Sequence, residues 1–285
     1  MGLIVGDALG APFEGMSGSE IEFNSKMENG GPNNIRAGQW TDDSSMALCL
    51  AESLIKDGFN LNSQMDRYVK WFENGYLSSK NRAFGIGRNT SLAITDYIQN
   101  NKLPSQRENA AGNGSIMRLA PIPMYYINNF DKTVYYSGKS SLTTHNNIMA
   151  IDSCKYLGAF IFHAINGKSK DYLLNDLYKN MDLDERVLDR VNGNYKTKEM
   201  NDINSNAFVL NTLEASLWCF NNSDGYESAL DLAINLGGDT DTTAAVTGQM
   251  AGSFYGINNI PKNWINKLAK KELILSLIRG LKQNF

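Results

Sequence analysis

Residues 236–245 read Leu-Gly-Gly-Asp-Thr-Asp-Thr-Thr-Ala-Ala, and a small-residue, apolar helical pattern continues through Gly252. Asp and Thr compete for backbone hydrogen bonds inside a helix, whereas at its N-terminus they satisfy N–H groups that lack a partner. The stretch therefore predicts the start of a buried helix. Its carboxylates and hydroxyls supply more hard oxygen than a cap needs, and such oxygen suits Mg²⁺, Mn²⁺ or Ca²⁺. Taken alone, it fits a simple cap and a metal ligand set equally well.

A second oxygen-rich cluster, Thr41-Asp42-Asp43-Ser44, stands before an apolar helical run at residues 46–57. Asp43 or Ser44 would serve as the N-cap of that helix. Adjacent carboxylates repel each other, however, so capping does not explain both of them. If the two helix N-termini face one another, they could hold two hard cations with bridging carboxylates. The presence of both clusters favours this interpretation over two separate caps.

The composition is typical of a soluble globular protein, with 42% hydrophobic and 20% charged residues in 285. No repeat or low-complexity linker divides the chain, so we expect a single domain over residues 1–285. The net charge of -3 gives no basic surface for nucleic acid, and no apolar run approaches membrane-spanning length. The scattered Cys49, Cys154 and Cys219 indicate reduced thiols in a cytoplasmic compartment. We expect a monomer that binds neither nucleic acid nor membrane.

Apolar residues recur at intervals of three to four along most of the chain, and alternating strand patterns are nearly absent. We therefore expect an all-α fold. The helical pattern covers residues 46–57, 65–74, 90–100, 147–166, 206–220, 226–236, 242–255 and 263–283. Residues 121–126 fit either an extended segment or the start of a helix. His163 lies in an apolar helical context and is expected to pack there, whereas His145 lies in a polar segment and is the better functional candidate.

Glycines mark three further segments. Gly2, Gly6, Gly10 and Gly15 recur at about helical intervals, which would let another helix approach closely. Residues 112–118 read Gly-Asn-Gly-Ser-Ile-Met-Arg and predict a tight loop whose backbone N–H groups can cradle a phosphate. The loop is neither a P-loop nor a dinucleotide fingerprint, and an ordinary turn is the alternative. Residues 85–90 are a weaker case of the same kind.

Four motifs, in this order, resemble the ADP-ribosylglycohydrolases, the enzymes related to dinitrogenase reductase-activating glycohydrolase. They occupy residues 6–14 (GDALGAPFE), 40–44 (WTDDS), 112–118 (GNGSIMR) and 237–242 (GGDTDT). The resemblance covers essentially the whole chain, and the four motifs together are far more specific than any one of them. Members of that family usually have about one more helical turn before Gly2, so we expect a short or trimmed N-terminus, which would loosen the first helix without removing a motif.

The resemblance implies a compact all-α domain with two Mg²⁺ or Mn²⁺ ions in a cleft. The implied metal ligands are Thr41, Asp42, Asp43, Asp239, Asp241 and Thr242. The implied substrate-binding residues are Gly112, Asn113, Gly114 and Ser115, which would hold the ADP-ribose phosphates and ribose, and His145 in the same channel. The implied catalytic residues are Glu14, Asp42 and Asp241. Met117 and Arg118 would fix the loop from behind, with Arg118 in a structural salt bridge.

The implied reaction is hydrolysis of ADP-ribose from ADP-ribosylated protein side chains, at an N- or O-glycosidic bond. Such cleavage passes through an oxocarbenium-like state, and a carboxylate acts as base or acid. Glu14, which matches a mobile glutamate of the family, is expected to be gate and base, with Asp241 as the alternative. Two other functions stay open: a di-metal hydrolase of a small ADP-ribose derivative, and a non-catalytic ADP-ribose-binding or structural member of the family. No readable motif encodes the linked amino acid.

Overall fold

Helices make up the secondary structure of residues 1–282, the part of the chain that the computed structural model describes. Between them lie loops, short 3₁₀ turns and isolated β-bridges, and this part of the chain contains no β-strand. The all-α prediction is therefore confirmed. The helices are α1 (Gly2–Gly10), α2 (Asp42–Asp57), α3 (Leu61–Asn74), α4 (Arg88–Asn100), α5 (Pro121–Tyr125), α6 (Phe130–Ser141), α7 (Ile148–Ile165), α8 (Lys170–Asn175), α9 (Glu185–Val191), α10 (Val209–Asn221), α11 (Tyr226–Asn235), α12 (Thr240–Tyr255), α13 (Lys262–Lys267) and α14 (Lys271–Lys282).

The predicted helices are present with shifts of a few residues at their ends, except for the last one. The prediction of one helix over residues 263–283 is wrong, because α13 and α14 are separate. Between them the Ala269 N–H donates to the Gly38 carbonyl at 2.9 Å, and Lys270 takes a left-handed φ of 46°. The apolar pattern does not cover α1, although glycine spacing and the family resemblance predicted a first helix, and it misses α6, α8 and α9.

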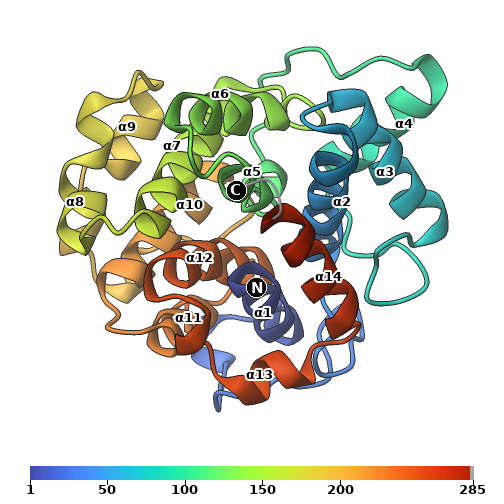
Figure 1. Ribbon diagram of the computed structural model, residues 1–285. Helices are drawn as coiled ribbons and strands as arrows, with labels where there is room; N and C mark the ends of the chain where they lie inside the picture. The colour runs from blue at the N-terminus through green and yellow to red at the C-terminus, as the bar shows by residue number, and fades with distance from the viewer. Residues whose placement is uncertain (283–285) are drawn as a thin grey trace.

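α1 and α12 lie at the centre of the molecule, and the other helices surround them (Figure 1). Glycines on α1 bring the two backbones into direct contact. A Cβ added at Gly6 would lie 2.1 Å from the Ala244 carbonyl oxygen, and one at Gly10 would lie 2.3 Å from that of Thr240. The predicted close approach is therefore confirmed for Gly2, Gly6 and Gly10, whereas a Cβ at Gly15 would meet no atom within 4 Å. It also places the end of α1 beside the beginning of α12.

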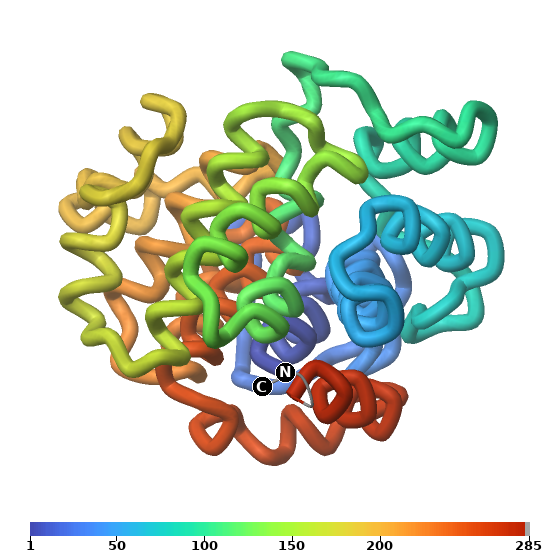
Figure 2. The backbone as a smooth tube through the Cα atoms, turned by 45° about the horizontal axis from the view of Figure 1, so that its top comes forward, coloured from blue at the N-terminus to red at the C-terminus, as the bar shows by residue number. Residues whose placement is uncertain are grey.

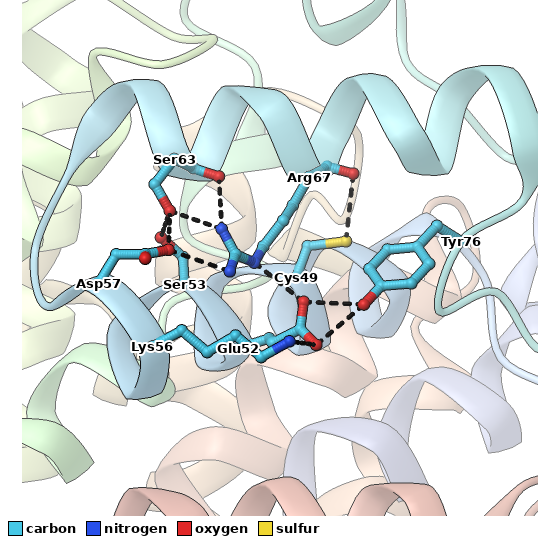
Figure 3. A network of polar contacts seen from close by, with 8 residues as sticks. All are labelled: Cys49, Glu52, Ser53, Lys56, Asp57, Ser63, Arg67 and Tyr76. Atoms are coloured by element: carbon cyan, nitrogen blue, oxygen red, sulfur yellow. Dashed lines mark hydrogen bonds and ion pairs between the residues drawn. The ribbon is translucent and has the colours of Figure 1, made fainter.

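A polar network joins α2 to α3 (Figure 3). Arg67 Nε donates to Glu52 Oε2 at 2.9 Å, and Arg67 Nη2 pairs with Asp57 at 3.0 Å. The Tyr76 hydroxyl contacts both Glu52 carboxylate oxygens at 2.9 Å. α14 packs against α2 as well, and it lies beside α2 in both backbone views (Figure 2). α2 is thus held by neighbours along its length while its N-terminus points to the site described below.

α7 is the one helix in residues 1–282 that is long and apolar enough to cross a membrane, judged by length and composition alone. The expectation that no apolar run approaches that length is therefore wrong for α7. Most of α7 is buried among other helices, and core helices of soluble proteins meet the same criteria. The three cysteines are buried and free of disulfides, as predicted.

Candidate active site

A cavity of about 810 Å³ lies where the N-termini of α2 and α12 meet the loop around Gly112. Most of the predicted site residues line it: Glu14, Asp42, Asp43, Gly112, Asn113, Gly114, His145, Asp239, Asp241 and Thr242. Thr41 and Ser115 are buried behind its wall. The structure therefore brings both acidic clusters and the glycine loop to one cavity.

The first turn of α2 is capped by another helix rather than by its own side chains. α2 begins after Thr41, which makes no side-chain cap, so the prediction of Asp43 or Ser44 as N-cap is wrong. Asp7 of α1 supplies the acceptor instead. It receives hydrogen bonds from the Thr41 N–H at 3.0 Å, the Ser44 N–H at 3.0 Å and the Ser44 hydroxyl at 2.5 Å. Capping therefore does not require the carboxylates of Asp42 and Asp43, which line the cavity.

We expect Asp7→Ala to lower the free energy of unfolding by about 2–3 kcal/mol, because it leaves two N–H groups at a buried helix start without an acceptor. Chemical denaturation followed by circular dichroism measures the change. Asp189→Ala, which removes an exposed carboxylate from α9, is the control for the lost charge. Equal stability of the two variants would contradict the capping role of Asp7.

Two consecutive glycines turn the chain into α12. Gly237 and Gly238 have φ values of 75° and 71°, a conformation that side chains rarely adopt. The Gly238 N–H donates to the Met16 carbonyl at 2.8 Å, and the Asp239 N–H donates to the Ser205 carbonyl at 2.7 Å. These bonds fix the turn, and the first turn of α12 lines the cavity as a result.

Asn113 ties the glycine loop to the acidic cluster. It opens a short 3₁₀ turn, Asn113–Ser115, and its Nδ2 donates to Asp239 Oδ2 at 2.7 Å and to Thr212 Oγ1 at 2.9 Å. The Asn113 backbone N–H donates to the Ala207 carbonyl at 3.1 Å. The loop is therefore held between α10 and α12, with its glycines against the cavity.

Glu14 follows the 3₁₀ turn Ala11–Phe13 that continues α1. Its side chain is half-buried, and Glu14 Oε2 accepts a hydrogen bond from Asn33 Nδ2 at 3.1 Å. Asp42 and Asp241, in contrast, are almost fully buried. Glu14 is therefore more accessible than Asp42 and Asp241, and Asp239 is partly buried like Glu14.

The carboxylates of the cavity have no basic partner. Among residues 1–282, no lysine or arginine forms an ion pair with them. Burial, and secondarily the neighbouring carboxylates, raise the pKa values of Asp42, Asp43 and Asp241 well above their usual range. Burial and the charge of Asp239 also raise the pKa of Glu14. Protons or cations are needed to offset this concentration of negative charge.

The chemistry of these residues fits a hard divalent cation. Asp43 Oδ1 and Asp241 Oδ1 are buried and accept no hydrogen bond from the described part of the chain. Carboxylate and hydroxyl oxygens are what Mg²⁺ and Mn²⁺ prefer. No three Asp, Glu, His or Cys side chains of residues 1–282 already converge as a metal site, which is consistent with mutual repulsion of carboxylates. Threonine hydroxyls and water molecules would complete the coordination of such an ion.

Arg118 holds the glycine loop from behind, as predicted, but within residues 1–282 it forms no salt bridge. Its Nη1 donates to the Gly114 carbonyl at 2.7 Å, and its Nη2 donates to the hydroxyls of Thr143 and Thr144. The guanidinium also lies over the Tyr68 ring, 4.9 Å from its centroid. The predicted salt bridge is wrong because neutral acceptors and an aromatic ring occupy the buried space around Arg118.

Two contributors to the site were missed or underrated by the sequence analysis. The signal for Asp7 is its place within a glycine-rich apolar helix, where an unpaired charge is costly and a carboxylate therefore indicates a specific partner. The loop at residues 85–90 closes against Asp42: a Cβ added at Gly85 would lie 2.6 Å from Asp42 Oδ1. His163 behaves as predicted and packs among aromatic rings, including Phe130 at 4.8 Å between centroids.

The helical fold and this arrangement of acidic helix N-termini beside a glycine loop agree with the family resemblance of the four motifs. The sequence model of the ADP-ribosylglycohydrolase family matches residues 1–285. The chain therefore belongs to the ADP-ribosylglycohydrolase family, and it is a hydrolase of glycosidic bonds.

Several known proteins resemble the whole chain. The ADP-ribosylarginine hydrolase Tri1 of Serratia proteamaculans is 38% identical over 284 residues, which cover 99% of this chain and 77% of that protein. The ADP-ribosyl-[dinitrogen reductase] glycohydrolase of Rhodospirillum rubrum is 29% identical over 277 residues, 95% of this chain and 89% of that protein. A solved ADP-ribosylglycohydrolase-related protein complex contains a chain with a TM-score of 0.88 and 35% identity, covering 99% of this chain and 95% of that one.

Proposed function

We propose that this protein removes ADP-ribose from arginine side chains of proteins by hydrolysing the N-glycosidic bond, and that it requires Mg²⁺ or Mn²⁺. The observation that carries the proposal is the cavity in which two acidic helix N-termini face a glycine loop. Its volume of about 810 Å³ lies within the range of small-molecule sites. Similarity to the ADP-ribosylarginine hydrolases of Serratia proteamaculans (38%) and Pseudomonas putida (35%) supports arginine as the linked residue.

The residues that would hold two metal ions come from both helix N-termini: Thr41, Asp42, Asp43, Asp239, Asp241 and Thr242. When bound, such ions supply charge neutralisation and Lewis-acid activation of water or sugar hydroxyls. Within the described part of the chain, the lack of basic partners and the unpaired carboxylate oxygens of Asp43 and Asp241 support this assignment. Asp42 and Asp241 would take part in catalysis as ligands of these ions.

The protein's own groups position the substrate and move the proton. Backbone N–H groups of the Gly112–Ser115 segment other than that of Asn113, which donates to Ala207, bind the diphosphate, and the Asn113 side chain keeps the segment beside Asp239. Glu14 is the general base: it is half-buried, faces the cavity, and has a pKa that burial and Asp239 raise. It removes a proton from the attacking water, while the bond between the ribose anomeric carbon and the guanidine nitrogen breaks. The nitrogen takes up a proton, giving free ADP-ribose and arginine.

Hydrolysis is tested with peptides that carry ADP-ribose on arginine or on serine, in Mg²⁺, Mn²⁺ or EDTA. We expect release of ADP-ribose, detected by mass spectrometry, from the arginine-linked peptide and only with metal. Glu14→Gln should slow this release by a factor of about 10²–10⁴, because it removes the base, while ADP-ribose still binds. Absence of turnover on every linkage would refute the proposal. Release of AMP would instead indicate a phosphoesterase acting on an ADP-ribose derivative.

A further inference from the structure

Arg118 is a buried cation whose hydrogen-bond acceptors are neutral. Arg118 is 1% exposed. Its guanidinium donates to the Gly114 carbonyl and to the hydroxyls of two adjacent threonines. Nη2 donates to Thr143 Oγ1 at 2.9 Å and to Thr144 Oγ1 at 2.7 Å. A guanidinium has donors only, so both hydroxyl oxygens must accept these bonds.

The two threonines then use their protons differently. The Thr143 hydroxyl donates to the Ser140 carbonyl at 2.7 Å. The Thr144 hydroxyl oxygen lies 2.8 Å from His145 Nδ1, which is the only other polar contact of that hydroxyl within residues 1–282. If Nδ1 carried a proton, the Thr144 proton would face no acceptor in a buried place. The Thr144 hydroxyl and Nδ1 are both satisfied only when Thr144 donates to an unprotonated Nδ1.

We propose that Arg118 and Thr144 are positioning residues that fix His145 as the neutral tautomer with its proton on Nε2. Arg118 orients the Thr144 hydroxyl, and the hydroxyl in turn selects the tautomer. The ring thereby presents an N–H donor at the cavity.

The surroundings of the ring agree with this assignment. His145 lines the cavity beside the glycine loop. A Cβ added at Gly112 would lie 3.1 Å from Nε2, and one at Gly114 would lie 2.6 Å from Cε1. No group of residues 1–282 accepts a hydrogen bond from Nε2, so its natural partner is an acceptor oxygen of a ligand. Burial and the charge of Arg118 lower the pKa of His145 to about 3, which keeps the ring neutral.

The ligand chemistry follows from the donor. An Nε2–H binds a phosphate or hydroxyl oxygen, whereas the opposite tautomer would direct a lone pair at it. That the oxygen belongs to ADP-ribose rests on the proposed function. The tautomer itself does not, because it is set by contacts within the ligand-free protein.

Nitrogen NMR of the imidazole rings tests the tautomer directly. The chain has only two histidines, and the partly exposed His163 serves as the internal reference. In the wild-type protein at pH 7.5 without ligand, we expect His145 to carry its proton on Nε2. In Thr144→Val the preference for this tautomer should weaken, with a shifted Nδ1 resonance and a detectable second form. Thr144→Ser should restore the wild-type spectrum. Thr143→Val is the matched control and should leave the His145 nitrogens unchanged.

Binding of ADP-ribose, measured by calorimetry in Mg²⁺, gives the second readout. Thr144→Val should raise the Kd about tenfold or more, and Thr144→Ser should keep it near the wild-type value. A proton on Nδ1 in the wild-type protein, or on both nitrogens, would overturn the inference. So would identical His145 spectra for the wild-type protein and Thr144→Val. The NMR experiment needs no turnover, so its failure is distinct from failure of the proposed hydrolysis.

Discussion

Asp43→Asn is expected to unfold at a higher temperature than the wild-type protein in EDTA, and to lose most of the stabilisation that Mn²⁺ or Mg²⁺ gives. Asp43 is buried beside Asp42 and Asp7, without a basic partner, and its Oδ1 accepts no hydrogen bond from residues 1–282. Asparagine removes one of the repelling charges and places an N–H₂ donor among carboxylates. An uncompensated buried charge costs several kcal/mol, so relief of about 2 kcal/mol is expected.

The sign of the effect follows from the pKa shift. Burial and neighbouring carboxylates raise the pKa of Asp43 in the folded state, so the folded protein binds a proton more tightly than the unfolded chain. The stabilising contribution of such a group is complete below the unfolded pKa, and it is lost as the pH rises through the folded pKa. As the pH rises, the metal-free wild-type protein therefore loses stability through Asp43, whereas the asparagine variant has no titrating group at this position.

With metal bound, we expect the wild-type protein to be more stable than Asp43→Asn, the reverse of their order in EDTA. At a free metal concentration of 100 times Kd, binding stabilises the wild-type protein by about 2.7 kcal/mol. The variant loses a carboxylate ligand and should gain much less. Thermal unfolding at pH 8, with EDTA and then with a series of Mn²⁺ concentrations, measures both effects. Asp189→Asn, on the exposed face of α9, controls for general charge. A lower Tm in EDTA together with an undiminished metal response would refute the proposed site.

Local sequence patterns predicted most of the longer helices and the acidic helix N-termini, because these features depend on residues that are close together in the chain. The residues around Asp42 and Asp241 signal helix N-termini wherever those helices pack. The cap of α2 could not be predicted in this way, because its acceptor, Asp7, lies 37 residues before Ser44 and meets it only through packing. Since Asp7 takes the capping role, Asp42 and Asp43 remain available to the cavity. The sequence pointed to the same conclusion for another reason, namely that capping does not explain two adjacent carboxylates.

The hydrogen-bond acceptors of Arg118 show a case in which the sequence-based prediction was wrong. A buried arginine usually predicts a carboxylate nearby, because an unpaired buried charge is costly. Here the guanidinium is satisfied by a loop carbonyl and two hydroxyls that come from the segment after α6. Nothing in the local pattern around Arg118 identifies threonines 25 and 26 residues away as its acceptors. The tautomer of His145 depends on the same contacts, so the local sequence does not predict it either.

The contact between α1 and α12 yields the second large effect: Gly6→Ala should destabilise the protein by about 3 kcal/mol and weaken metal binding. Its new Cβ would lie 2.1 Å from the Ala244 carbonyl oxygen, and that atom is backbone within a central helix. The helices must therefore separate, which overpacking studies place at about 1–3 kcal/mol or more. Gly138→Ala in α6 is the matched control, because its Cβ would meet chiefly the flexible Lys155 side chain.

The expected loss of metal affinity in Gly6→Ala distinguishes this prediction from one of destabilisation alone. α1 carries Asp7 and leads to Glu14, while α12 carries Asp241, so separation of the helices also separates the carboxylates. Gly138→Ala should be neutral or slightly stabilising, since alanine favours helix over glycine by about 1 kcal/mol. Denaturant unfolding in EDTA gives the stability of both variants, and titration with Mn²⁺ under folded conditions gives their affinity. If Gly6→Ala matched Gly138→Ala in both measurements, the contact between the two helices would not be what aligns the acidic clusters.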